Sequence, residues 1–170
     1  MKGTAPSGQL LALIQALDKG PGKGGYLSML RSADIPLVEL EPFSSWNERH
    51  YTRNCIVQRE AYELLLICFE KGQRTSIHDY NTEEAYVRPM VGAVLEERYE
   101  PEPQGGVRQV GSVLLSPESV SHLHDGHSIH RYVNAFPGRS MTLNLYARPL
   151  RKWRVYDERT GSSHMGPADS

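Results

Sequence analysis

Hydrophobic residues near the N-terminus recur at helical spacing. In the segment 8–18, the apolar residues Leu10, Leu13 and Leu17 share one helical face, and the Gly/Pro-rich stretch "KGPGKGG" follows. A second short helix is predicted over about 25–32. We interpret the first segment as an amphipathic helix and not a signal peptide, because only one Lys precedes it and no small-residue cleavage site follows it.

After Pro42 the pattern changes to short β-like runs separated by turn-forming residues. These runs are "HYTRNCIVQ", "YELLLICFE", "SIHDY", "EAYVRPMVG", "AVLEERYE", "VRQVGSVLL", "SIHRYVNAF", "MTLNLYARP" and "RVYDERTG". About nine strands spaced roughly ten residues apart are typical of an all-β sandwich or barrel.

The length of 170 residues suits one domain with a sizeable core. We predict a single domain over residues 1–161, with a helical part at 1–40 and a β-barrel at 41–161. The segment 162–170 is small and polar, and we expect a flexible tail there.

Composition narrows the class of function. Charged residues make up 23% and the net charge is −1, so no basic excess argues for nucleic acid. No apolar run approaches the roughly 18 residues of a membrane-spanning helix. Cys55 and Cys68 each sit in an apolar strand-like run. We expect both to be small buried residues with reduced thiols, which favours a cytoplasmic location.

Histidines supply the first candidate chemistry. Four of the seven, His122, His124, His127 and His130, fall close together, and His78 ends another predicted strand. A small β-barrel can converge imidazoles from several strands at its mouth. The run "HLHDGH" taken alone is interpreted as a polar loop, and a lone histidine is usually a hydrogen-bonded surface or core residue.

The spacing of one segment is more specific. Gly72-x5-His78-x-Tyr80-x4-Ala85-x6-Gly92 has the spacing of the first cupin motif, G-x5-H-x-H-x4-E-x6-G. Residues one apart on a strand project to the same face, so positions 78 and 80 are expected to point into a barrel together. The pair His130-x3-Asn134 fits the end of the second cupin motif.

Five elements in order resemble the cysteine dioxygenases, thiol dioxygenases of the cupin superfamily. They are "HYTRN", "LLLICFEKGQRTSIHD", "SIHRYVN", "MTLNLYARPL" and "YDERTG". The resemblance covers about residues 40–161. It implies a cupin-type barrel (a double-stranded β-helix or jelly roll) preceded by helices.

The resemblance also implies roles for individual residues. His78 and His130 match iron-ligating histidines, and Arg53 matches the residue that binds the substrate carboxylate. Tyr51 lies on the same strand face as Arg53. Tyr146 matches the active-site tyrosine whose hydroxyl points at the bound species. The roles agree with general chemistry, because a guanidinium forms a planar fork for a carboxylate and neutral imidazoles suit Fe(II).

Four positions depart from the family pattern. Tyr80 stands where a second histidine ligand is expected. Ala85 stands where mammalian members carry the Cys of a Cys–Tyr crosslink, so that crosslink is impossible here. Asn144 replaces a relay histidine, and Thr142 replaces its serine partner. An asparagine forms hydrogen bonds but does not pass a proton near neutral pH.

Three interpretations of Tyr80 stay open. Its phenolate could bind the metal, which requires metal-driven deprotonation of a phenol with a pKa of about 10. Alternatively it points into the site without binding, which leaves a two-histidine centre or a gap filled by His122, His124 or His127. The third interpretation is a dead site in which Tyr80 only packs.

The sequence therefore predicts an oxygenase that acts on a small thiol. The expected catalytic residues are Tyr146 and Tyr80, and the expected substrate-binding residues are Arg53, Tyr51 and Asn144. Iron is the expected metal, with nickel, copper or zinc as alternatives. The substrates would be O2 and cysteine or a close thiol amino acid. The product would be a sulfinate or a rearranged compound such as a sulfonamide.

A non-catalytic cupin that binds a small thiol or amino acid is the rival from another class, and a metal-free structural cupin is a third option. The oligomeric state stays open.

Overall fold

A computed structural model describes residues 3–80, 84–124, 129–148, 152–160 and 162–167, and for some of these, including Tyr80 and His124, the backbone alone. The helices are α1 (Gly8–Asp18), α2 (Gly25–Ser32), α3 (Leu37–Leu40) and the 3₁₀ helix η1 (Glu41–Phe43). The strands are β1 (Thr52–Gln58), β2 (Tyr62–Phe69), β3 (Ile77–Tyr80), β4 (Glu84–Val91), β5 (Val94–Pro101), β6 (Val107–Leu115), β7 (Ser121–His124), β8 (Ile129–Asn134), β9 (Ser140–Ala147), β10 (Lys152–Tyr156) and β11 (Ser163–Pro167).

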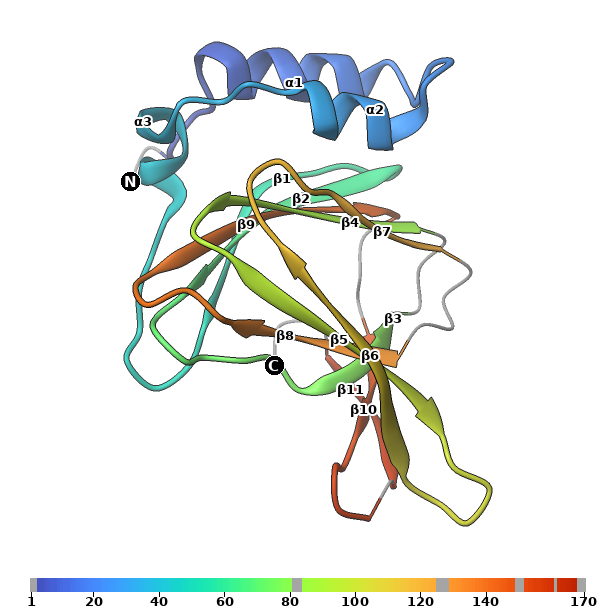
Figure 1. The fold of residues 1–170 in the computed structure, drawn as a ribbon. Helices are drawn as coiled ribbons and strands as arrows, with labels where there is room; N and C mark the ends of the chain where they lie inside the picture. Colours follow the sequence, from blue (N-terminus) through green and yellow to red (C-terminus); the bar gives the residue numbers. More distant parts are fainter. Residues whose placement is uncertain (1–2, 81–83, 125–128, 149–151, 161, 168–170) are drawn as a thin grey trace.

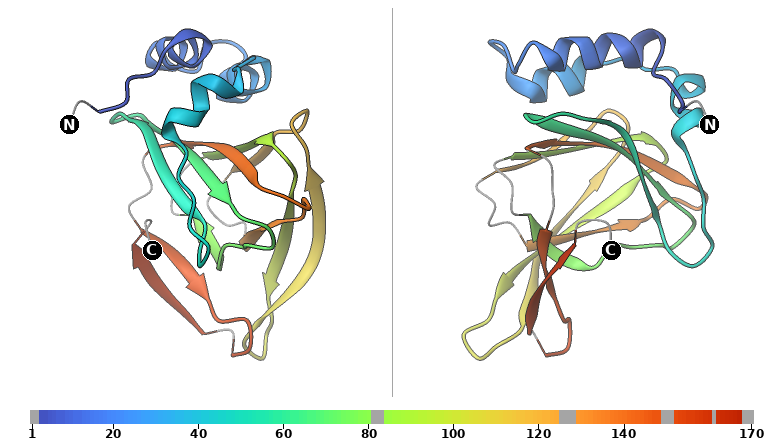
Figure 2. Two further views of the ribbon diagram at one scale, coloured as in Figure 1. Left: turned by 90° about the vertical axis from the view of Figure 1, so that its left-hand side faces the viewer. Right: turned by 180° about the vertical axis from the view of Figure 1, so that it is seen from behind.

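The strands form two antiparallel sheets that face each other. Sheet A has the order β1-β2-β9-β4-β7, and sheet B has the order β11-β10-β3-β8-β5-β6. The N-terminal helices lie over the outer face of sheet A, opposite sheet B (Figures 1 and 2). This arrangement confirms the predicted mainly β architecture and the two helices at 8–18 and 25–32.

Two strands were not expected from the sequence. Ser121–His124 forms β7, although "HLHDGH" was interpreted as a polar loop; Leu123 enters the core between the sheets and so fixes the strand. Ser163–Pro167 forms β11, which pairs with β10 from Tyr156↔Ser163 to Lys152↔Pro167. The expected flexible tail is therefore a paired edge strand over these residues, because backbone pairing orders a segment that has little to bury.

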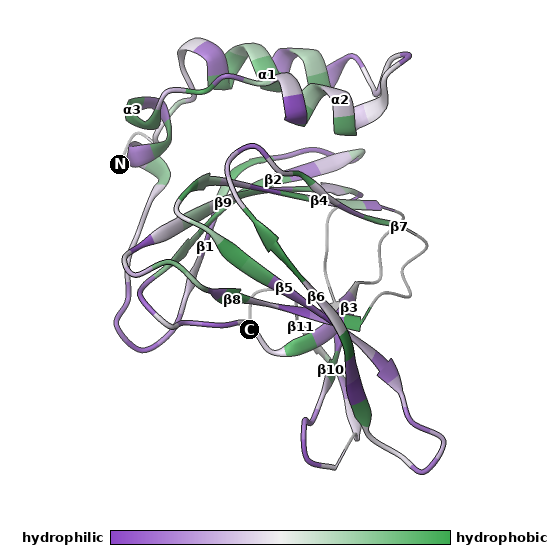
Figure 3. Cartoon of the chain, in the orientation of Figure 1, coloured by the Kyte–Doolittle hydropathy of each residue, from purple (hydrophilic) through white to green (hydrophobic). Residues whose placement is uncertain are grey.

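Side chains of sheet A alternate between two cores. On β2, Tyr62, Leu64 and Leu66 pack with the helices in what we call the helix-facing core. Leu65 and Phe69 point the other way and belong to the barrel core between the sheets. Hydrophobic segments on the helices and on the strands beneath them are visible in Figure 3. Because successive residues of a strand project to opposite faces, sheet A is buried on both sides.

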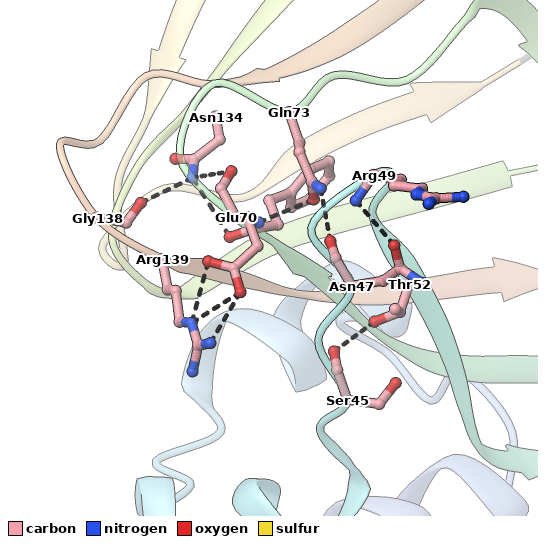
Figure 4. Close-up of polar contacts among 10 residues, drawn as sticks. Ser45, Asn47, Arg49, Thr52, Glu70, Gln73, Asn134, Gly138 and Arg139 are labelled. Carbon is pink, nitrogen blue, oxygen red and sulfur yellow. Dashed lines mark hydrogen bonds and ion pairs between the residues drawn. The ribbon is translucent and has the colours of Figure 1, made fainter.

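The side chain of Asn134 contacts Glu70 and Gly138, which lie in two different turns (Figure 4). Its side-chain amide donates to the carbonyls of Glu70 at 2.9 Å and Gly138 at 2.8 Å, and its Oδ1 accepts the Phe136 N–H at 3.1 Å. The amide therefore connects two backbone segments, the turn after β2 and the loop between β8 and β9. These contacts explain why an asparagine stands at the end of the predicted second motif without involving it in metal binding.

Only one of the two cysteines has the burial that the sequence predicts. Both are free thiols, and Cys68 is buried as predicted, but Cys55 is exposed. Cys55 lies on β1, the edge strand of sheet A, next to an irregularity in the register between Cys55 and Val57. An edge position with a bulge leaves one side of the strand open to solvent. No helix in the described part of the chain has the length and apolarity to cross a membrane.

Gly72 and Gly92, the two ends of the first motif, give a matched test of the fold. Both have a positive φ, of 77° and 73°. A Cβ on Gly92 would lie 2.2 Å from Ser140 Oγ and 3.0 Å from the Arg139 carbonyl, whereas a Cβ on Gly72 would meet nothing within 4 Å. We expect Gly72→Ala to lower the free energy of unfolding by about 1 kcal/mol and Gly92→Ala by about 3 kcal/mol.

Denaturant unfolding of both variants measures the difference. Equal losses would mean that the close approach at Gly92 contributes nothing beyond backbone strain.

Candidate active site

Two imidazoles lie side by side on neighbouring strands of sheet B. His78 on β3 and His130 on β8 are Cα partners, which places both side chains on the same face of the sheet. Their ring centroids are 4.5 Å apart with an angle of 59° between the planes. His78 is 2% exposed and His130 is fully buried. The two predicted ligand positions are therefore brought together, inside the barrel.

The hydrogen bonding of His78 fixes its tautomer. Nδ1 lies 2.7 Å from the Ser76 carbonyl oxygen, which accepts a proton and cannot donate one. Nδ1 therefore carries the hydrogen, and the lone pair of the neutral ring lies on Nε2. Burial, followed by the charges of His130 and Arg53, holds the pKa of His78 well below 6.5. A neutral imidazole whose other nitrogen donates to a carbonyl is the usual state of a metal-ligating histidine.

Three of the other predicted residues lie on the strands of sheet A or directly before them. Arg53 lies on β1 with its Cζ 6.0 Å from the centroid of the Tyr146 ring, and Tyr146 on β9 is fully buried. Tyr51 stacks on Phe69 of the barrel core, with ring centroids 5.5 Å apart. Burial is also the main cause of the raised pKa of Tyr51. A cation and two phenols thus line the interior on the sheet A side.

A chain of polar side chains runs along the inner face of β9. The Thr142 hydroxyl donates to Asn144 Oδ1 at 2.7 Å, and Asn144 Nδ2 donates to the Tyr146 hydroxyl oxygen at 3.1 Å. Thr142 and Asn144 are each 1% exposed. Because Tyr146 accepts from Asn144, its own O–H proton points away from Asn144 and can be donated to another acceptor.

Ala85 lies directly across from Tyr146 in the β4–β9 register and is 1% exposed. The position is therefore adjacent to the phenol, as a crosslink partner would have to be. A methyl group has no sulfur with which to form a thioether, so Tyr146 stays uncrosslinked. Glu84, one residue earlier, accepts a hydrogen bond from the Tyr86 hydroxyl on the helix-facing side of sheet A, away from the histidine pair.

Three of the candidates for the third ligand lie outside the described side chains. The backbone of Tyr80 ends β3 and pairs with Trp153. Its side chain is not described, nor are the side chain of His124 and the residue His127. The suggestion that His122 fills the gap is wrong. His122 stacks on Tyr86 at 4.4 Å, in the helix-facing core, because alternation along β7 sends Leu123 inward instead.

The donors present fit one divalent transition metal. Two adjacent imidazoles suit iron, nickel, copper or zinc. Among the described residues, no group of three His, Cys, Asp or Glu side chains could hold a metal ion.

Sequence reasoning missed a polar cluster behind His130. Tyr132 is 3% exposed, and its ring lies edge-on to that of His130 at 5.3 Å. Its hydroxyl donates to Glu96, a fully buried carboxylate on β5. Two signals could have revealed the pair: Tyr132 is two residues beyond His130 and so shares its face, and Glu96 alternates with Val94 in "AVLEERYE".

Comparison with known proteins identifies relatives. A sequence profile of the family "Cysteine dioxygenase type I" matches residues 27–159. Cysteine dioxygenase type 1 of Danio rerio is 26% identical over 124 residues, which cover 70% of this chain and 62% of that protein. The human protein of the same name is 23% identical over 128 residues, covering 73% and 64%. The chain spans less than two thirds of the length of these two relatives.

Solved structures agree on the fold. A Thermus thermophilus protein has a TM-score of 0.54 at 17% identity and covers 64% of this chain and 93% of its own. A Desulfitobacterium hafniense cupin superfamily protein has a TM-score of 0.50 at 18% identity, covering 69% and 93%. The predicted cupin-type, double-stranded β-helix architecture is therefore confirmed.

The depressed pKa of His78 predicts how stability depends on pH. An imidazole with a lower pKa when folded binds its proton more tightly in the unfolded chain. Its contribution to stability is complete above pH 6.5 and is lost as pH falls below that value. We expect the metal-free protein to lose about 1 kcal/mol more than its His78→Gln variant between pH 7.5 and 5.5.

Urea unfolding at the two pH values measures this loss, and His50→Gln serves as a control because His50 is exposed. A pH dependence that His78→Gln leaves unchanged would show that His78 is not held neutral by the fold.

Proposed function

We propose a function from one premise: the chain belongs to the cysteine dioxygenase type I family. The proposed activity is oxidation of the sulfur of L-cysteine, or of a close thiol amino acid, by O2 at a mononuclear non-haem metal. The observation that carries it is the meeting of unlike groups in one interior. The adjacent imidazoles of His78 and His130 come from sheet B, and Arg53 and Tyr146 come from sheet A.

Arg53 would bind the substrate carboxylate. A guanidinium donates two parallel hydrogen bonds to a carboxylate, and such charge-assisted bonds are about twice as strong as neutral ones. Tyr51 precedes β1 and packs on Phe69, and in this role its ring would limit the space beside Arg53. Arg53 and Tyr51 together would favour a small amino acid over a larger acidic ligand.

His78 and His130 would hold the metal, with Tyr80 beside it or bound to it. Fe(II) is the metal that the family implies, and the same donors suit nickel, copper or zinc. When bound, the metal would favour the thiolate over the thiol and supply the redox chemistry with O2. Two free thiols in the chain suit the reducing environment of the cytoplasm, in which we expect the protein to work.

Tyr146 would orient the bound species as a hydrogen-bond donor. Asn144 Nδ2 donates to the phenol oxygen at 3.1 Å, and the direction of that bond turns the Tyr146 proton away from Asn144. An amide does not take up a proton near neutral pH, so Asn144 positions the phenol without exchanging protons with it. This differs from a relay that contains histidine.

Two products are compatible with this site. One is the sulfinate, in which the sulfur gains both atoms of O2. The other is a further oxidised or rearranged product, such as a sulfonamide made in specialised metabolism. The replacements at positions 80 and 144 give the second nearly equal weight, because they change a ligand position and the proton relay at the same time.

A non-catalytic cupin that binds a small thiol or amino acid would use the same Arg53 and histidine pair without consuming O2. Uptake of O2 by the iron-loaded protein separates the two functions. We expect uptake with L-cysteine and much less with cysteamine, which lacks the carboxylate that Arg53 would bind. Arg53→Gln should remove this preference, because the amide cannot form the charged fork.

Mass spectrometry of the product completes the test. A gain of two oxygen atoms with nothing lost identifies the sulfinate and rules out the rearranged product. Binding of cysteine without any thiol-dependent O2 uptake, with iron, nickel, copper or zinc loaded in turn, would reject the enzyme and favour the binding protein.

Two substitutions test Tyr80. Tyr80→Phe removes only the phenol oxygen, and Tyr80→His restores the common ligand type at this position. If the oxygen serves the site, we expect both variants to alter the absorption spectrum of the metal-loaded protein and Tyr80→His to shift the product towards the sulfinate. Spectra and products identical to those of the unaltered protein would exclude Tyr80 from the site.

A further inference from the structure

The carboxylate of Glu96 is fully buried between the two sheets, and its hydrogen bonds are complete. Oε1 accepts from Arg98 Nε at 2.9 Å and Nη2 at 2.7 Å. Oε2 accepts the hydroxyls of Tyr132, at 3.0 Å, and Ser121. A buried carboxylate persists only where such partners compensate its lost hydration. Because an ionised carboxylate only accepts, both hydroxyls are held as donors.

The contacts of Glu96 connect the sheets close to the histidine pair. Ser121 belongs to β7 of sheet A, whereas Glu96 and its Cα partner Tyr132 belong to sheet B. Two residues further along β5, Arg98 is the Cα partner of His130 on β8. Glu96 therefore pairs with the residue two positions from His130, a candidate metal ligand, and on the same face of the sheet.

Tyr132 is fixed both at its hydroxyl and at its backbone. Its hydroxyl is fixed by Glu96, and its backbone forms two bonds with Thr75: the Tyr132 N–H donates to Thr75 Oγ1 at 3.0 Å, and the Thr75 N–H donates to the Tyr132 carbonyl at 2.9 Å. Thr75 lies three residues before His78. The same tyrosine thus links the strand of His130 to the segment that leads into His78.

The ring of Tyr132, fixed in this way, contacts the ring of His130. The two rings meet edge to face, with centroids 5.3 Å apart and 65° between the planes, and His130 contacts His78 on a further side. An imidazole directs its lone pair in the plane of its ring, so a neighbour that fixes the plane also fixes the direction of coordination.

We propose that Tyr132, anchored by Glu96, is a positioning residue that sets the ring plane of His130 and so tunes the affinity of the histidine pair for a metal. The proposal rests on the proposed function only in treating His130 as a ligand. Tyr132 acts through His130, and Ser121 acts one step further away, through Glu96.

Tyr99 offers a matched control. Its hydroxyl also donates to a carboxylate, Glu97 Oε2, at 2.7 Å, and the residue is 7% exposed. It packs with Ile77 and Ile129 in a separate cluster on the opposite face of sheet B from the histidine pair. Tyr99→Phe removes the same kind of bond from the same sheet, away from the candidate site.

The experiment uses Tyr132→Phe and Tyr99→Phe in the full chain. In metal-free protein labelled with ¹⁵N-histidine, the ring nitrogen signals of His130 are recorded at pH 8, where imidazoles are neutral. Titration with Co(II) then gives the dissociation constant. We expect Tyr132→Phe to shift the His130 signals and to weaken Co(II) binding on the order of tenfold, and Tyr99→Phe to change neither. Thermal unfolding shows whether the two variants lose similar stability.

Unchanged His130 signals and Co(II) affinity in Tyr132→Phe would overturn the proposal, as would equal changes in Tyr99→Phe. Failure of the proposed function is distinguishable. If the unaltered protein binds no Co(II), the metal role fails and the His130 signals alone decide whether Tyr132 sets the ring. If the signals shift while no thiol drives O2 uptake, the enzyme fails and the positioning role stands.

Discussion

Burial of sheet A on both faces is the constraint from which the rest of the structure follows. Helices cover its outer face and sheet B covers its inner face, so β2 and β9 have no side open to water. Leu143 and Leu145 satisfy the helix side with apolar groups. On the inner side β9 instead presents polar groups, which must bond to one another because water is excluded.

This requirement explains the order of the polar chain on β9. Thr142, Asn144 and Tyr146 follow at the period of a strand, and each bonds to the next. The same rule applies on sheet B, where Glu96 is tolerated because hydroxyls and a guanidinium surround it. A dry interior with directed donors is where hydrogen bonds and charges act most strongly on a bound substrate.

Alternation and turn spacing allowed much of the fold to be predicted from the sequence. The first two helices and nine strands follow from periodicity, and the placement of His78 and Arg53 in one interior was expected from the family resemblance. The rest depended on contacts between distant segments. β11 buries little and exists through pairing with β10. His122 faces the helices because Leu123 takes the inward position. The partners of Glu96 come from two other strands, Tyr132 on β8 and Ser121 on β7, so its buried role depends on contacts between distant segments.

On this proposal, His78 and His130 would together hold a metal in the interior that also contains Arg53 and Tyr146. The most direct test is elemental analysis of the gently purified protein beside its His78→Ala and His130→Ala variants. The account predicts about one divalent transition metal per chain in the unaltered protein and almost none in either variant. Equal metal content in all three proteins, or a folded protein that takes up no metal from excess Fe(II), would contradict it.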